Sequence, residues 1–165
     1  MSKVPERAVG QYEIQLKDVD GHVLPATIEL GCRDWTEGVG RRTECRIKLQ
    51  WTGGAIEKID WHFFESFKRV REQLALHGLL PVCYGASRKV ILTGMGIDMA
   101  LGRKAYRVDE DGQLIRPTVD IFKTGDDVEP VSVEEQEQFQ DEWWKPFREQ
   151  SSRITQQNNP IGADS

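Results

Sequence analysis

The chain has 165 residues, a length that fits one domain with a hydrophobic core that needs no metal or disulfide. Apolar residues make up 38% and charged residues 30%, with a net charge of -5, a globular composition that excludes a disordered chain. No apolar run approaches the roughly 20 residues of a membrane helix, and the N-terminal segment lacks the apolar stretch of a signal peptide. We therefore expect a soluble, cytoplasmic protein with no membrane partner.

Residues 1–10 are expected to form a flexible arm. Beyond them, alternating apolar residues and turn residues predict strands at 11–17, 23–30, 43–51, 55–59, 79–84, 89–92, 103–108 and 118–122. Pro25 cannot donate to a strand ladder, so the strand 23–30 is expected at a sheet edge or with a bulge. The segment Gly94–Gly102 is expected to be irregular. Short strands linked by turns favour antiparallel pairing.

Two helices are predicted from apolar residues at helical spacing. The first covers residues 61–77, with Asp60 as its N-cap. The second covers residues 133–148, where an aromatic stripe of Phe139, Trp143 and Phe147 suits packing on a sheet. The fold class expected is α+β: a curved, mainly antiparallel sheet with both helices packed on one face, forming a single domain over residues 11–150. Residues 151–165 are expected to be a flexible tail.

The search for chemical motifs predicts no catalytic, cofactor-binding or metal site, and hence no enzyme. The chain has neither the P-loop spacing nor a GxSxG motif. The three histidines and three cysteines show no paired metal-ligand spacing. Cys32, Cys45 and Cys83 are an odd number without CxxC spacing, so we interpret them as small core residues.

Charge is unevenly distributed along the chain. Residues 109–142 hold twelve Asp and Glu against two Lys and Arg, and such a surface attracts basic partners. The alternative interpretation is a solvated face, with Glu134 and Glu135 simply favouring a helix N-terminus. We predict a partner-binding surface in this segment, formed by Asp109, Glu110, Asp111, Asp126, Asp127, Glu129, Glu137 and Asp141.

A second interpretation rests on the central part of the chain. Residues 40–107 hold thirteen Lys and Arg against six Asp and Glu, which would suit a nucleic acid. These cations are dispersed without interleaved aromatic residues, and the pI of about 5.3 opposes the idea, so no nucleic-acid partner is expected. The alternative function kept is a nucleic-acid-binding or small-molecule-processing protein that uses the loops Tyr84–Arg88 and Gly94–Gly102.

Two stretches in the second half of the chain resemble small bacterial proteins encoded beside polymorphic toxins of the Rhs type. One is GLLPVCYGAS at residues 78–87, continuing through Gly94-Met95 and Asp98-Met99 to residues 104–106. The other is VDIF at residues 119–122, followed by residues 126–130 and the helix start SVEEQ at 132–136. The resemblance implies a cytoplasmic immunity protein that binds its cognate toxin domain and covers the active site of that toxin. It implies no cofactor and assigns no interface residue.

Overall fold

The computed structural model describes residues 4–157, with side chains as far as residue 150. These residues form a mixed fold of helices and antiparallel strands, which confirms the predicted α+β class. The strands divide between two sheets, where the sequence predicted one. In chain order the elements are β1 (Arg7–Lys17), β2 (Val23–Glu37), β3 (Gly40–Trp51), β4 (Gly54–Asp60), α1 (Phe63–Ala75), β5 (Leu80–Pro81), the 3-10 turn η1 (Tyr84–Ala86), β6 (Val90–Ile91), α2 (Gly94–Ala100), β7 (Lys104–Val108), β8 (Leu114–Asp120) and α3 (Val133–Gln157).

The larger sheet has five strands in the order β4-β3-β2-β1-β5. Its strands alternate buried apolar residues with exposed polar ones, because successive side chains in a strand point to opposite faces. Because β2 lies between β3 and β1, the strand 23–30 is not at a sheet edge. The bulge offered as the alternative is not at Pro25 either, since the register of β1 and β2 shifts only between Ala8 and Gly10. Pro25 is tolerated because the ladder with β3 begins only at Thr27, so Pro25 pairs with β1 alone.

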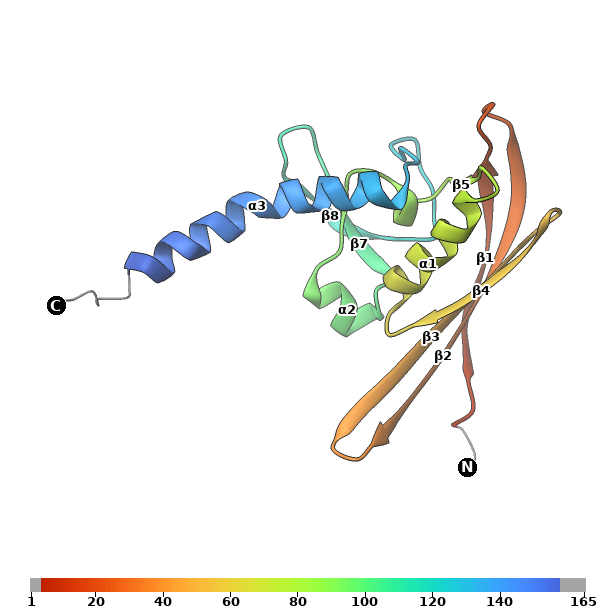
Figure 1. Ribbon diagram of the computed structural model, residues 1–165, viewed down its shortest axis with the longest axis horizontal. Coiled ribbons are helices and arrows are strands. Elements are labelled where there is room, and N and C mark those ends of the chain that lie inside the picture. The colour runs from red at the N-terminus through yellow and green to blue at the C-terminus, as the bar shows by residue number, and fades with distance from the viewer. Residues whose placement is uncertain (1–3, 158–165) are drawn as a thin grey trace.

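Helix α1 covers the buried face of this sheet (Figure 1). Phe63, Phe67 and Leu74 are almost completely inaccessible to solvent, and burying each contributes roughly 1.5–3 kcal/mol. The predicted N-cap, Asp60, accepts a hydrogen bond from the Trp61 amide instead. The N-cap is His62, whose Nδ1 accepts from the Glu65 amide at 3.1 Å.

The smaller sheet has the order β6-β7-β8 and shares one core with the larger sheet. Phe122, just after β8, connects the two. Its ring lies 5.1 Å from that of Phe67 on α1 and 5.2 Å from that of Tyr12 on β1. The Tyr12 hydroxyl also donates to Asp120 at 2.6 Å. The prediction of a flexible arm is wrong for residues 7–10, which belong to β1; residues 1–3 lie outside the described residues.

The segment Gly94–Gly102, expected to be irregular, contains the short helix α2. Thr93 caps it by accepting a hydrogen bond from the Gly96 amide at 3.2 Å. The helix ends at Leu101 and Gly102, which both have positive φ. Only glycine fits at position 102, since an added Cβ would lie 2.8 Å from Nδ1 of His62.

Helix α3 packs on α1 and β6 through its first turns, and its second half projects away from the body on the side opposite the larger sheet (Figure 1). The predicted aromatic stripe therefore does not pack on that sheet. Trp143 and Trp144 are half-buried and Phe147 is 49% exposed. Residues 151–157 continue the helix, where a tail was expected, and residues 158–165 lie outside the described residues. Within the described chain, no helix has both the length and the apolarity to cross a membrane.

Candidate partner-binding site

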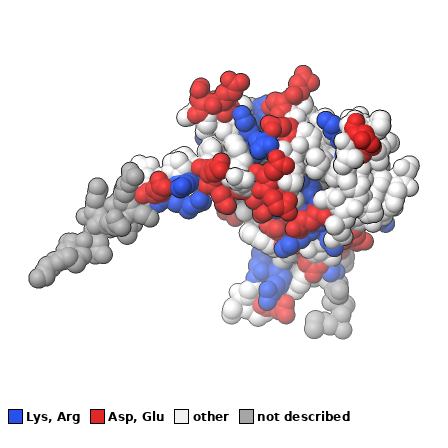
Figure 2. Space-filling model, turned by 45° about the horizontal axis from the view of Figure 1, so that its top comes forward, with Lys and Arg blue, Asp and Glu red and all other residues white. Residues whose placement is uncertain are grey.

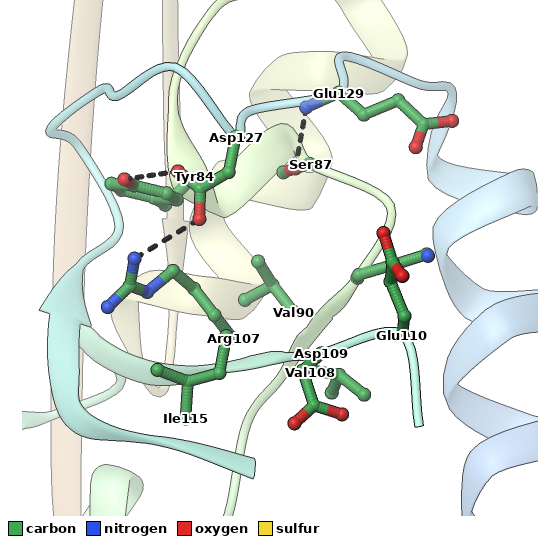
Figure 3. Close-up of a pocket in the computed structure, with 11 residues that line it drawn as sticks. Tyr84, Ser87, Val90, Arg107, Val108, Asp109, Glu110, Ile115, Asp127 and Glu129 are labelled. Atoms are coloured by element: carbon green, nitrogen blue, oxygen red, sulfur yellow. Dashed lines mark hydrogen bonds and ion pairs between the residues drawn. The ribbon is translucent and has the colours of Figure 1, made fainter. Parts of the chain in front are cut away.

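A pocket of about 300 Å³ opens beside the smaller sheet (Figure 3). Its walls come from η1 and the residues after it, β6, β7, the turn between β7 and β8, the start of β8, and the loop that leads to α3. Apolar side chains of Val90, Val108 and Ile115 line one part, while charged and hydroxyl groups line the rest. The lining residues are Tyr84, Ser87, Lys89, Val90, Arg107, Val108, Asp109, Glu110, Ile115, Asp127 and Glu129.

Asp127 is held in the wall by two donors. The Tyr84 hydroxyl donates to its Oδ1 at 2.7 Å, and Nη1 of Arg107 donates to its Oδ2 at 3.1 Å (Figure 3). Both hydrogen bonds lower the pKa of Asp127 below its ordinary value, and the one from Tyr84 contributes more than the one from Arg107. Burial, and then the contact with Asp127, raises the pKa of Tyr84. Asp127 is thus a carboxylate and Tyr84 a neutral phenol at neutral pH.

A second group fixes the opposite wall. The Ser87 hydroxyl accepts a hydrogen bond from the Glu129 amide at 2.8 Å (Figure 3). The guanidinium of Arg88 binds Glu129 at 2.6 Å and Glu135 at 2.8 Å. Both hydrogen bonds raise the pKa of Arg88, and the one to Glu129 contributes more than the one to Glu135. The loop before α3 and the first turn of α3 are therefore tied to the segment that follows η1.

A buried polar network lies beneath these walls. Arg71 of α1 donates to the carbonyls of Gly85 and Val131 and to Oε1 of Gln136, at 3.1, 3.0 and 2.6 Å. Gln136 in turn donates to the carbonyls of Gly85 and Ser87. Burial lowers the pKa of Arg71 to about 10, so the guanidinium stays protonated at neutral pH. The network binds α1, η1 and α3 together and gives the pocket a rigid base.

The structure brings four of the eight predicted binding residues together, since Asp109, Glu110, Asp127 and Glu129 all line the pocket. Asp109 also organises its turn by accepting hydrogen bonds from the amides of Asp111 and Gln113. The other four predicted residues, Asp111, Asp126, Glu137 and Asp141, are exposed and do not line the pocket. Among them, Glu137 pairs with Lys68 of α1 at 3.3 Å.

Seven of the eleven lining residues are missing from the predicted partner-binding set, among them Tyr84, Ser87 and Arg107. The network residues Arg71 and Gln136 are missing from it as well. The sequence contained a signal for Arg71, which falls among the apolar residues of the α1 stripe. A charged residue at such a position is buried only when it is hydrogen-bonded. The loop Tyr84–Arg88 of the alternative function does contribute Tyr84 and Ser87, whereas the Gly94–Gly102 segment contributes no lining residue.

Several basic residues of the central segment are paired with neighbouring acids. On the hairpin of β2 and β3, Arg41 pairs with Asp34 and Arg42 with Glu37. Arg46 contacts acids on three segments. Its guanidinium nitrogens lie 2.7 Å from the carboxylate of Glu6, 3.4 Å from that of Glu29 and 3.3 Å from that of Glu57. This pairing leaves little uncompensated positive charge on the hairpin for a phosphate backbone.

One exposed group has the donor atoms of a metal site. Asp18, Asp20 and His22 lie in the turn between β1 and β2, with potential ligand atoms within 4.8 Å of one another. The turn itself explains this arrangement, because Oδ1 of Asp18 accepts hydrogen bonds from the amides of Asp20 and His22. The three cysteines are buried, as the sequence predicted.

Comparison with known proteins assigns no family: no protein-family model matches the chain, and no curated protein matches it. The geometry of the pocket is therefore the main guide to function. The pocket is lined by four acidic residues against two basic ones, Lys89 and Arg107, beside an apolar surface. This excess of carboxylates suits the binding of a cationic side chain, whose aliphatic part needs apolar contact and whose head needs carboxylates.

Proposed function

We propose that this protein is an immunity protein, which binds a basic toxin domain through its acidic face and neutralises it. The observation that carries the proposal is the convergence of Asp109, Glu110, Asp127 and Glu129 from two separate loops on one pocket. Figure 2 shows Asp and Glu gathered on this side of the molecule, with fewer Lys and Arg among them. The identity of the partner as a toxin rests on the sequence resemblance alone.

The rigid support of the pocket favours a binding role. The Tyr84–Asp127 and Ser87–Glu129 hydrogen bonds fix the carboxylate-bearing loop before any partner arrives. A preorganised surface loses less conformational entropy on binding than a flexible one, which improves affinity without additional contacts. The carboxylates of Asp127 and Glu129 remain about half exposed, so they are accessible to a partner despite their internal ion pairs.

The first test is co-expression with the product of the adjacent upstream gene. We expect the two proteins to co-purify as a complex, and cells that make the upstream product to survive only when this protein is made as well. Absence of any complex, or turnover of a small molecule by the purified protein, would contradict the proposal.

The second test locates the surface by charge reversal. Glu110→Lys with Asp126→Lys changes two exposed acids for which the described residues provide no ion pair, so the fold should be retained. We expect association to slow by roughly tenfold at low ionic strength, because steering by the acidic field is lost. The matched control is Glu13→Lys with Asp20→Lys, the same charge change on β1 and on the turn that follows it. Equal rates for both pairs would remove the acidic face from consideration.

A further inference from the structure

An aromatic cluster lies on α3 where the helix leaves the body. The rings of Trp143 and Trp144 are 4.8 Å apart, and those of Trp143 and Phe147 are 5.0 Å apart. Both tryptophans are half-buried, and Phe147 is 49% exposed. Large aromatic residues that remain exposed together often mark a surface used for binding. The cluster plays no part in the pocket, so the proposed function does not yet account for it.

The cluster is joined to the acidic turn between β7 and β8. Nε1 of Trp143 donates to the carbonyl of Gly112 at 2.9 Å. This hydrogen bond holds the acidic turn, which contains the exposed residues Glu110 and Asp111, against the helix at Trp143. On the helix itself, Asp141 and Glu142 are exposed and immediately precede Trp143 in the sequence. The aromatic surface and the pocket therefore flank the same acidic turn.

The charges around the cluster determine what it can bind. The turn 109–112 and the helical segment 141–149 together hold six Asp and Glu against two Lys and Arg. An aromatic face surrounded by carboxylates favours a cation, because the negative faces of the rings and the carboxylates attract the same group. A purely apolar partner would leave the carboxylates facing a surface that cannot compensate them. An anionic lipid surface would be repelled by them.

We infer that the Trp143-Trp144-Phe147 cluster binds an arginine-rich segment of the partner, with guanidinium groups stacked on the rings and paired with the neighbouring carboxylates. This inference rests on the proposed function and extends its surface from the pocket along α3. Arginine is favoured over lysine because its planar group stacks on an aromatic ring while also binding a carboxylate. Trp143 is the ring that joins the helix to the turn, whereas Trp144 is partly exposed and Phe147 is 49% exposed, so both rings can contact the partner.

The test uses a ten-residue peptide of alternating arginine and glycine as the probe. Its dissociation constant is measured by fluorescence anisotropy against the full-length protein and against Trp144→Ala with Phe147→Ala. We expect the double variant to bind at least about fivefold more weakly, since two cation–π contacts are lost. Trp143 is left in place so that the turn keeps its hydrogen bond. The matched control is Trp61→Ala, which removes a tryptophan that is 56% exposed at the start of α1; its affinity should stay within about twofold of the unaltered protein.

The outcomes separate this inference from the proposed function. If the aromatic variant binds the peptide as tightly as the unaltered protein, or if the unaltered protein does not bind it, the inference is wrong. The proposed function is tested independently, by co-expression with the upstream gene product and by the charge-reversal pair. Two other results would also overturn the inference, because each assigns the cluster another occupant. One is a dimer in sedimentation that is lost in the aromatic variant. The other is binding to phosphatidylserine vesicles that is lost in the same variant.

Discussion

At the scale of single residues, Gln136 is the buried polar side chain on which the site most depends. It is fully inaccessible to solvent, and its amide contacts Arg71 of α1 and the carbonyls of Gly85 and Ser87. Replacing Gln136 by leucine leaves the Ser87 carbonyl and one donor of Arg71 without these partners in a buried space. Such groups cost more when unpaired than a hydrogen bond contributes when made.

We therefore expect Gln136→Leu to lower the free energy of unfolding by about 2–3 kcal/mol, measured by urea denaturation. Gln138→Leu makes the same chemical change at an exposed position two residues along α3 and should stay within about 0.5 kcal/mol of the unaltered protein. Similar losses in the two variants would show that the network contributes nothing particular to stability.

His62 gives a second prediction at this scale, a dependence of stability on pH. Burial lowers the pKa of His62 below its ordinary 6.5, with Asp60 opposing the shift. Near pH 7.5 and above, the imidazole is mostly neutral in both the folded and unfolded states, and its Nδ1 caps α1. As the pH falls below about 6.5, the unfolded chain takes up the proton first, so the free energy of unfolding decreases until the folded-state pKa is passed.

His62→Asn keeps an N-cap but cannot take up the proton, so it should remove this part of the pH dependence. The measurement is urea denaturation of both proteins at intervals from about pH 5 to 8, with the two stability profiles subtracted. The difference should change across the range below 6.5 and be constant above about 7.5. Parallel profiles throughout would mean that His62 does not titrate differently on folding.

At the scale of elements, α3 combines a packed first half with a projecting second half that contains Pro146. Proline has no amide hydrogen, so the helix loses one backbone hydrogen bond at this position, at a cost of roughly 3 kcal/mol relative to alanine. We expect Pro146→Ala to slow amide hydrogen exchange over residues 141–150 while leaving exchange in α1 unchanged. Lys145→Ala is the control, because it changes an exposed side chain without restoring a backbone donor. Unchanged exchange in Pro146→Ala would show that neighbouring groups already compensate for the missing bond.

The strands and helices differ in how well the sequence predicted them. The alternation from Thr43 to Trp51 predicted β3 correctly, because strict alternation of apolar and polar residues is compatible with few structures other than a strand. The α1 stripe predicted its helix within a few residues for the same reason. Helix α2 was missed because its three-residue start, Gly94-Met95-Gly96, has poor helix propensity and depends on the Thr93 cap. The end of α3 was missed because the sequence at 151–157, SSRITQQ, has no apolar residues at helical spacing.

The site was only partly predictable, since it depends on contacts between distant segments. The excess of acids at residues 109–129 was visible in the sequence and includes four residues that line the pocket. Nothing local indicates that Asp127 meets Tyr84 and Arg107, which are 43 and 20 residues away. The partners of Arg71 and Gln136 are similarly distant and follow from the packing of α1 against α3.

At the scale of the whole molecule, the two sheets form one body because a single core runs through both. Phe122 is 2% exposed and lies at the junction, against Phe67 of α1 and Tyr12 of β1. The core includes Val90 and Ala105 of the smaller sheet together with the buried residues of the larger one. The pocket is therefore supported by the complete fold, and its rigidity should depend on the integrity of this junction.

We expect Phe122→Ala to lower the free energy of unfolding by about 3–5 kcal/mol, because the substitution leaves a cavity in the core between α1 and β1. Since the core is continuous, hydrogen exchange in β2–β3 and in β7–β8 should accelerate together, as in one cooperative unit. Phe147→Ala, which truncates a phenylalanine that is 49% exposed, should change neither. Faster exchange in β7–β8 alone would indicate that the smaller sheet unfolds separately from the larger one. The pocket would then be carried by an independent unit, and the partner would have to order that unit on binding.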